Sequence, residues 1–423
     1  GIICINFEFG TNPHLLGKSF PENLEDVLLS QAGHGCGVVR VAKDNAGKWN
    51  VVFDKRNRRI TVNTPVEFDG PVAGTEFLEN TAGNAPLGTV NNCGSGVTPW
   101  GTYLTCEENF NGYFGSNDPN FEPLNEKQVR YGLSGGGFGY GWHVFDERFD
   151  LSNPNYANEY NRFGWVVEID PQNPDKAPVK HTALGCFKHE AIAIRVPDTG
   201  KVHCYMGDDQ RFDYCYKFVS KKPWEVAVKQ GESPLAEGSL YVARFNEDGT
   251  GDWLELSINN PALAAKFSSQ AELLVNTRIA ADLLGATPMD RPEWTTIAAD
   301  GDSVFWTLTN NNRRDEPNVA NPESPNNDGH IIRTCDRGEG NGTKFDWEFF
   351  ILASQTRETA EVFTDPDAAY ADPDGRLYIG TDGGQPDGLQ DQLTVFDTTA
   401  ELAEGELPKA MRLFVGVNSD EIT

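Results

Sequence analysis

The hydrophobic pattern of this chain consists of short apolar or alternating runs, each ended by glycine, aspartate, asparagine or proline. Alternation with a period of two between such residues is typical of half-buried β-strands joined by turns. Stretches such as DNAGK at 44–48 and DPDGR at 372–376 are turn signals. The pattern predicts strands at residues 37–42, 49–53, 60–62, 102–106, 165–170, 191–196, 203–206, 215–219, 239–245, 303–308, 330–334 and 377–380.

Helical periodicity is confined to two segments. Residues 261–284 carry apolar side chains at a spacing of three to four, and Asn260-Pro261 is a plausible helix start. A second, shorter helix is predicted at 23–31.

Many short strands without alternating helices indicate an all-β fold, either a pair of sandwiches or a β-propeller. We favour a six-bladed β-propeller with loop and helical insertions, although no repeat is regular enough to define the blades. Because no stretch has the composition of a linker, we expect one domain over residues 1–423. Propellers gather loops from distant blades at one axial face, so residues far apart in the sequence can meet there.

Charge and composition exclude several classes of function. The 423 residues include 35 Lys+Arg and 63 Asp+Glu, for a net charge of −28. This charge argues against a nucleic-acid partner. No apolar run is long enough to span a membrane, and no signal peptide is recognisable at the start of the sequence. The eight cysteines form no C-x-x-C motif, and their pairing cannot be deduced, although Cys204 and Cys215 flank a predicted hairpin.

The segment with the most candidate chemistry is 91–110, where a glycine-rich turn leads into a strand that ends in carboxylates. A Cys93 thiolate with Glu107 or Glu108 could ligate a metal ion. The alternative is a buried cysteine, which acts as a small apolar residue, beside an exposed acidic strand end.

Further polar clusters stand at other strand ends. Lys188-His189-Glu190 is a candidate cluster or a solvated strand entrance, and Asp208-Asp209 suits a Ca²⁺ site or an ordinary turn. In Arg291-Pro292-Glu293 the charged side chains can point to one side, as an anion and metal site or as a surface salt bridge. Asp365-Pro366-Asp367 and Asp382 are cation-binding loops or plain turns.

Common catalytic motifs are absent from the sequence. It has no G-x-S-x-G and no H-E-x-x-H. The glycine-rich stretch LSGGGFGYG at 133–141 lacks the lysine and hydroxyl residue of a P-loop, so we expect a flexible insertion there.

Several of these motifs resemble the PhoX-type alkaline phosphatases, in matching order over nearly the whole chain. The longest is NNCGSGVTPWGTYLTCEENFNGYF at 91–114, and the others are KHEA (188–191), YMGDDQRFDYCYKFVS (205–220), RPEW (291–294), LTNN (308–311) and FTDPDAAYADPDGRLYIGTDG (363–383). The resemblance implies a six-bladed propeller that hydrolyses phosphomonoesters to inorganic phosphate with Fe³⁺ and Ca²⁺. It also implies a monomer exported to the periplasm or secreted, with a signal segment that is not in this chain.

The same resemblance implies roles for individual residues. Cys93 would be the thiolate ligand of iron, and Glu108, Glu190 and Glu293 carboxylate ligands. Arg291 would contact phosphate, so that Arg291, Glu190 and Glu293 form the catalytic set. The match also places Glu8, Asp208, Asp367 and Asp382 in metal-binding motifs without assigning each to one ion.

Two other functions stay open. One is a calcium-dependent propeller hydrolase acting on phosphodiesters, phosphotriesters or lactones, which does not need the Cys93 thiolate. The other is a non-catalytic propeller scaffold whose acidic surface serves solubility, which composition and spacing alone would favour.

Overall fold

The computed structural model describes residues 1–338, 342–385, 389–403 and 405–416. The chain divides into two compact units. Unit 1 comprises Gly1–His189, Leu235–Glu237 and Ser257–Ala280, and unit 2 comprises Glu190–Pro234, Gly238–Leu256 and Ala281–Thr423.

Unit 1 contains two small sheets. In the first, β2 pairs with β1, β3 and β4, all antiparallel. The second has the order β5-β9-β8-β7-β6, in which only the β5–β9 pair is parallel. The strands are β1 (Ile2–Phe7), β2 (Gly35–Lys43), β3 (Trp49–Val51), β4 (Arg58–Ile60), β5 (Glu67–Asp69), β6 (Asn92–Val97), β7 (Tyr103–Glu107), β8 (Val166–Ile169) and β9 (Val179–His181).

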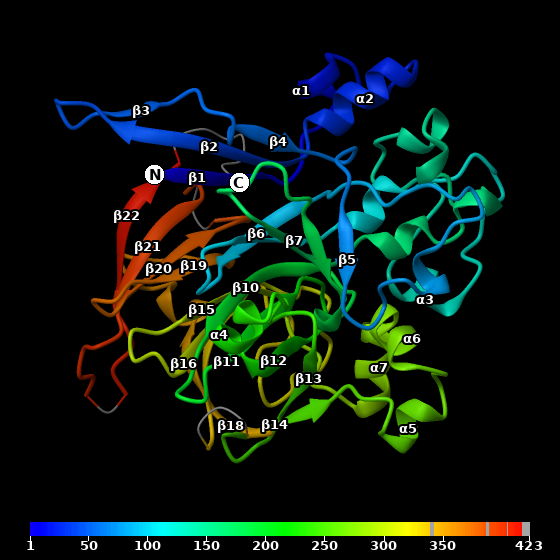
Figure 1. The fold of residues 1–423 in the computed structure, drawn as a ribbon. Helices are drawn as coiled ribbons and strands as arrows, with labels where there is room; N and C mark the ends of the chain where they lie inside the picture. The colour runs from blue at the N-terminus through cyan, green and yellow to red at the C-terminus, as the bar shows by residue number, and fades with distance from the viewer. Residues whose placement is uncertain (339–341, 386–388, 404, 417–423) are drawn as a thin grey trace. The chain divides into compact units, whose positions relative to one another are not determined.

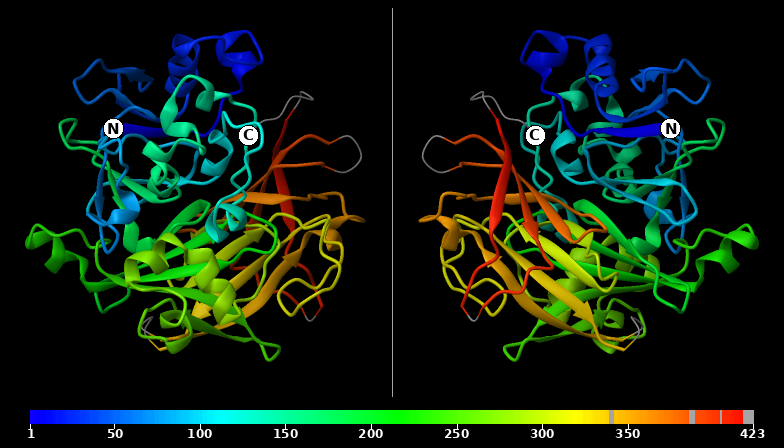
Figure 2. Two further views of the ribbon diagram at one scale, coloured as in Figure 1. Left: turned by 90° about the vertical axis from the view of Figure 1, so that its right-hand side faces the viewer. Right: turned by 90° about the vertical axis from the view of Figure 1, so that its left-hand side faces the viewer.

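The helices of unit 1 are short, and several of them begin at a residue whose side chain caps the helix. Asn23 accepts a hydrogen bond from the Asp26 N–H at 3.0 Å and begins α2, which confirms the helix expected at 23–31. Figures 1 and 2 show α1 and α2 next to each other, in blue. The α-helices are α1 (Asn12–Leu16), α2 (Leu24–Ala32), α3 (Glu126–Arg130), α5 (Pro261–Ala264), α6 (Gln270–Val275) and α7 (Thr277–Leu284), the last of which continues into unit 2. The 3-10 helices are Glu76–Leu78, Phe110–Tyr113, Trp142–Val144, Glu147–Phe149, Pro154–Tyr156, Glu159–Arg162 and Thr182–Leu184.

The helix predicted over 261–284 is broken into three pieces. Asn260 begins α5 as expected, by accepting a hydrogen bond from the Ala262 N–H at 3.0 Å. The chain then leaves the helix, and Ser269 caps α6 by accepting from the Glu272 N–H. A serine that bonds the backbone in this way starts a new helix rather than continuing the old one.

Unit 2 is built from one nine-stranded and one four-stranded antiparallel sheet. The larger has the order β10-β11-β12-β13-β14-β18-β17-β16-β15, and the smaller β19-β20-β21-β22. The smaller sheet, orange to red, is seen in Figures 1 and 2. The strands are β10 (His189–Arg195), β11 (Lys201–Asp208), β12 (Cys215–Pro223), β13 (Gly238–Phe245), β14 (Thr250–Glu255), β15 (Pro292–Ile297), β16 (Ser303–Leu308), β17 (His330–Asp336), β18 (Lys344–Leu352), β19 (Pro366–Ala371), β20 (Arg376–Thr381), β21 (Gln392–Asp397) and β22 (Ala410–Val415). The helices are α4 (Trp224–Lys229) and the 3-10 helix Ala353–Thr356.

The nine-stranded sheet is nearly closed, because its last strand, β15, returns to β11. The Thr295 hydroxyl donates a hydrogen bond to the Tyr205 carbonyl at 3.0 Å. Gly207 permits this approach, since a Cβ there would lie 2.2 Å from the Pro292 carbonyl oxygen. Tyr205 and Trp306 are among the aromatic residues of the buried core on this sheet.

Most of the fold expected from the sequence is present. The protein is mostly β with few helices, and a strand lies at eleven of the twelve predicted positions, whereas the strand predicted at 60–62 overlaps β4 only at Ile60. No disulfide bond occurs among the cysteines, all of which lie in the described ranges. Within those ranges, no helix has the length and apolar character needed to cross a bilayer.

Candidate functional site

Unit 1 brings together three side chains that could hold a metal ion: Glu8, Cys93 and Glu108. One ligand atom from each lies within 4.8 Å of the others. Glu8 follows β1, Cys93 is the second residue of β6, and Glu108 follows β7. The side chain of Asn6 ties these strands together by donating to the Cys93 carbonyl at 2.7 Å. The cysteine and the carboxylate at 108 that the sequence suggested are therefore neighbours, together with Glu8.

The two adjacent glutamates at the end of β7, Glu107 within the strand and Glu108 just after it, have separate environments. Glu107 is fully buried and forms an ion pair with Lys180 at 2.7 Å, so its charge is already balanced within the core. Glu108 accepts a hydrogen bond from the Asn109 amide, whose oxygen in turn accepts from Lys188 Nζ at 2.8 Å. Hydrogen bonds of this kind orient a metal ligand. Of the two candidates, the structure thus places Glu108 in the group.

Unit 2 contains a second group, formed by Glu190, Glu293 and Asp367. Their carboxylate oxygens also lie within 4.8 Å of one another. Glu190 and Glu293 are 1% and 3% exposed, and Asp367 is half-buried. Each is the second residue of its strand, in β10, β15 and β19 respectively. The solvated strand entrance considered for Glu190 is wrong, because the residue is buried, and the salt bridge considered for Glu293 does form with Arg291 but with Glu293 buried rather than on the surface.

Three of the candidate ligands are presented by the same backbone arrangement. Cys93, Glu293 and Asp367 each lie where the register of their strand shifts against the next strand. Such irregularities redirect a side chain out of the regular pleat.

The residue two positions before each of these ligands has a left-handed backbone. Asn91, Arg291 and Asp365 have φ values of 49°, 57° and 50°, and they are three of only four non-glycine residues with positive φ in the described chain. Such a conformation costs about 1 kcal/mol per residue, and strain of this kind clusters at functional sites.

Like charges crowd the group in unit 2. Burial raises the pKa of Glu293 well above its ordinary value, and the carboxylates of Asp209 and Asp367 raise it further. Burial, with the charges of Asp382 and Asp209, raises the pKa of Asp367 to about 7. Buried carboxylates this close need a compensating cation, and an all-oxygen set of ligands suits a hard one. The residues present therefore fit a bound metal ion.

Arg291 supplies part of the compensating charge. Its Nε and Nη2 donate to the two oxygens of Asp209, each at 2.9 Å, and Nη2 also lies 2.5 Å from Glu293 Oε1. The expectation that Arg291 and Glu293 point to one side is confirmed. The bidentate pair with Asp209 fixes the plane of the guanidinium.

Sequence reasoning considered the pair Asp208-Asp209 but carried only Asp208 forward as a ligand, and it did not single out Arg211. It selected Asp208, which is buried at the end of β11 and is absent from the ligand groups found among the described residues, whereas its neighbour Asp209 pairs with Arg291. It also passed over Arg211, which donates to Asn310 at 3.0 Å and whose pKa is lowered by burial and by the charge of Arg291. Both stand in the motif at 205–220, where the DDQR spacing was the available signal.

His189, between Lys188 and Glu190, has a structural environment. Its ring stacks on Phe187 at 3.6 Å, and its Nε2 bonds the Gly185 carbonyl at 2.8 Å. Burial lowers its pKa to about 3, so the ring is neutral. It is therefore suited to packing rather than to acid–base chemistry near neutral pH.

Clustered carboxylates, a cysteine and a fixed arginine on a mostly β framework are the features of a metal-dependent hydrolase. The family model described as alkaline phosphatase PhoX matches residues 1–418. The chain therefore belongs to the PhoX family of alkaline phosphatases, enzymes of the phosphoric monoester hydrolase class.

A solved structure supports this assignment. Pseudomonas fluorescens PhoX, in complex with vanadate, a transition state analogue, is 37% identical in sequence and aligns with a TM-score of 0.89. The alignment covers 98% of this chain and 77% of that chain. A puromycin-hydrolyzing peptidase of Mycobacterium tuberculosis aligns with a TM-score of only 0.25 and 11% identity, over 58% of this chain and 27% of its own, which indicates nothing about the fold. No curated protein matches the chain.

Proposed function

We propose that this chain releases inorganic phosphate from phosphomonoesters, using Fe³⁺ and Ca²⁺ held by its clustered side chains. The observation that carries the proposal is the presence of two ligand groups, one with a thiol and one with carboxylates only, in a chain of the alkaline phosphatase family. The vanadate complex of the Pseudomonas fluorescens protein supports it, because vanadate imitates a phosphoryl group in transfer.

The two groups suit different ions. Cys93 with Glu8 and Glu108 offers a soft thiolate and hard carboxylates, a mixed set that fits iron. Glu190, Glu293 and Asp367 offer oxygen only, which fits calcium. When bound, such cations neutralise the charge of the ester and polarise its phosphoryl oxygens.

The chain's own residues would hold the phosphoryl group in position. Arg291, oriented by Asp209, is the residue we propose to donate hydrogen bonds to the equatorial oxygens, where charge is stabilised in the transition state. Arg211 is a second candidate, because its buried Nε has no hydrogen-bond partner among the described residues. Asp208 and Asp382 stay proposed ligands from the family motif.

The finer architecture is also a proposal. The runs β10–β13, β15–β18 and β19–β22 each consist of four consecutive antiparallel strands, which is the topology of a propeller blade. We therefore propose a six-bladed propeller that forms one domain over residues 1–423. From the family resemblance we also propose a monomer that works in the periplasm or outside the cell.

Elemental analysis of protein purified without added metals tests the proposal, paired with p-nitrophenyl phosphate turnover before and after chelation. We expect iron and calcium in the protein, and loss of turnover on chelation that returns with the ions. Absence of iron would overturn the assignment of the thiol-containing group. Activity on phosphodiesters or lactones without activity on phosphomonoesters would favour the calcium-dependent hydrolase.

A further inference from the structure

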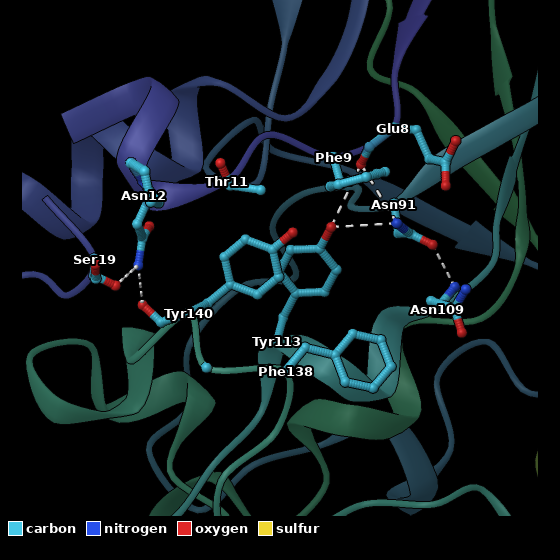
Figure 3. A pocket seen from close by; sticks show the side chains of 12 residues that line it. Glu8, Phe9, Thr11, Asn12, Ser19, Asn91, Asn109, Tyr113, Phe138 and Tyr140 are labelled. Atoms are coloured by element: carbon cyan, nitrogen blue, oxygen red, sulfur yellow. Dashed lines mark hydrogen bonds between the residues drawn. The ribbon is translucent and has the colours of Figure 1, made fainter. Parts of the chain in front are cut away.

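A cavity of about 550 Å³ opens in unit 1 beside the group of Glu8, Cys93 and Glu108. Glu8 belongs both to that group and to the wall of the cavity. Asn109, another wall residue, donates its side-chain hydrogen bond to Glu108. Figure 3 shows Glu8, Asn91 and Asn109 at one end of the cavity and Asn12 and Ser19 at the other. One end of the cavity therefore adjoins the proposed iron ligands.

Aromatic rings form the middle of the cavity. Tyr113 and Tyr140 stack with their centroids 4.4 Å apart and an angle of 15° between the rings. The Tyr113 hydroxyl accepts a hydrogen bond from Asn91 at 3.2 Å and donates to the Glu8 carbonyl at 3.4 Å. The stack is thus fixed relative to the residues at the metal-binding end, as Figure 3 shows.

The loop that carries Phe138 and Tyr140 is held in place at both sides. The Phe138 N–H donates to the Gly112 carbonyl at 2.7 Å, and the Phe138 ring lies against Gly112, where a Cβ would be 2.1 Å from its Cδ2. The Asn12 amide donates to the Tyr140 carbonyl at 3.0 Å, and its oxygen accepts from the Ser30 hydroxyl at 2.9 Å. The glycine-rich stretch at 133–141, expected to be a flexible insertion, is here an anchored wall.

Two rings of the wall remain accessible. Phe9 is 45% and Phe138 is 59% exposed, so each presents a face to a ligand. Among the twelve wall residues, all of them in the described chain, only Glu8 carries a charge, and the far end offers amide and hydroxyl groups. This lining suits a neutral, planar organic group with polar edges.

We propose that the cavity binds the organic group of the ester, so that the enzyme prefers phosphomonoesters whose organic group carries an aromatic or heterocyclic ring, such as aryl phosphates and nucleoside monophosphates, over small aliphatic esters. This inference rests on the proposed phosphatase function. The phosphoryl group lies toward Glu8, and the ring stacks on Phe138. Because stacking is the same before and during the chemical step, it lowers KM and leaves kcat unaffected.

Phe138→Ala tests the inference by removing one exposed ring, with Phe53→Ala as a matched control, since Phe53 is 97% exposed and is not part of the wall. For Phe138→Ala we expect KM for p-nitrophenyl phosphate and AMP to rise about five- to tenfold relative to KM for glycerol 2-phosphate, the loss typical of one stacking face. Phe138→Trp keeps a ring and should keep the preference. Phe53→Ala should keep all wild-type values.

Binding of adenosine gives a readout that does not depend on turnover. Saturation-transfer difference NMR should show adenosine contacting the wild-type protein and Phe53→Ala, with the signal reduced in Phe138→Ala. Equal preference and equal adenosine signal in wild type and Phe138→Ala would overturn the inference while leaving the phosphatase proposal intact. Adenosine binding in a protein that hydrolyses none of the three esters would instead overturn the phosphatase proposal.

Discussion

The two ligand groups present different chemical groups on the same backbone arrangement. In this arrangement, called the backbone device below, a left-handed residue stands two positions before a ligand that lies at a register shift. In unit 1 it presents Cys93, in company with half-buried Glu8 and next to an open aromatic cavity. In unit 2 it presents Glu293 and Asp367, among buried charges paired with Arg291. The left-handed residue, the register shift and the second position in the strand are common to both. The comparison shows that one backbone arrangement can present a thiol in one group and carboxylates in the other.

The largest effect should come from the carboxylate group. Glu293→Gln removes the charge of one of the three proposed carboxylate ligands, and we expect kcat for p-nitrophenyl phosphate to fall about 10³-fold, as loss of a metal ion's charge stabilisation predicts. Calcium content should fall with it. Glu247→Gln, in an exposed turn of the same unit, is the control. Unchanged turnover and calcium in Glu293→Gln would leave the acidic scaffold as the better explanation.

The thiol-containing group should respond differently to its own substitution. Cys93→Ala removes the soft ligand, so iron should be lost and kcat should fall about 100-fold. Calcium should be retained, since the all-oxygen group is intact. Cys335→Ala, which alters another half-buried cysteine, should retain iron. Iron retained in Cys93→Ala would contradict the assignment, and parallel loss of both ions would mean that the groups do not bind independently.

Unit 1 also contains a cluster of charged side chains that balance one another without a metal ion, unlike the carboxylate group of unit 2. In unit 1, away from the ligand group, His181 lies between Asp69 at 2.9 Å and Glu168 at 2.8 Å. Burial alone would lower the pKa of His181, but the two carboxylates raise it to about 9. Because the folded-state pKa exceeds the unfolded value of about 6.5, the stabilisation is complete below pH 6.5 and is lost as pH rises through 9.

This shift should be visible in unfolding experiments. We expect wild-type stability to fall by about 3 kcal/mol between pH 6.5 and pH 10, measured by urea unfolding of the metal-loaded protein. Asp69→Asn should move the loss to lower pH, because one of the two charges that raise the pKa is gone. A wild-type stability that stays flat over this range would show that His181 is neutral in the folded protein.

The smallest effect should come from the arginine. Arg291→Lys keeps the charge but loses the two-pronged contact with Asp209, and we expect kcat/KM to fall about tenfold. Both metal contents should stay at the wild-type level, which separates this variant from Glu293→Gln. Arg337→Lys is the control, because Arg337 forms an ion pair with Asp346 on the exposed surface. A loss of calcium in Arg291→Lys would show that the residue supports the ligand group rather than the ester.

The sequence located some strands and missed others, because each sequence pattern reports only on local structure. Period-two patterns located strands such as β16 to the residue, because both ends are marked by turn residues. They missed β18, whose partly exposed aromatic residues break the alternation, and β5, which is only three residues long. Strand pairing over long separations, such as β14 with β18, leaves no local mark.

The candidate site was predicted unevenly for a similar reason. Motif order identified Cys93, Glu190 and Glu293, but spacing could not separate Asp208 from Asp209 or Glu107 from Glu108. In a strand, adjacent residues point to opposite faces, so a choice between neighbours depends on where the register shifts. The shifts at Cys93, Glu293 and Asp367 come from pairing with other strands, which is why only the structure shows them.

Gly112 has a consequence for laboratory evolution of this enzyme. It is not one of the proposed ligands and does not line the cavity, yet the Phe138 ring rests directly on it. A single methyl group at residue 112 would displace that ring and change the width of the cavity, while the residues that perform hydrolysis stay untouched. Altered substrate scope would then arise from a mutation that no inspection of catalytic side chains would select, and saturation of this one codon is an economical route to new specificities.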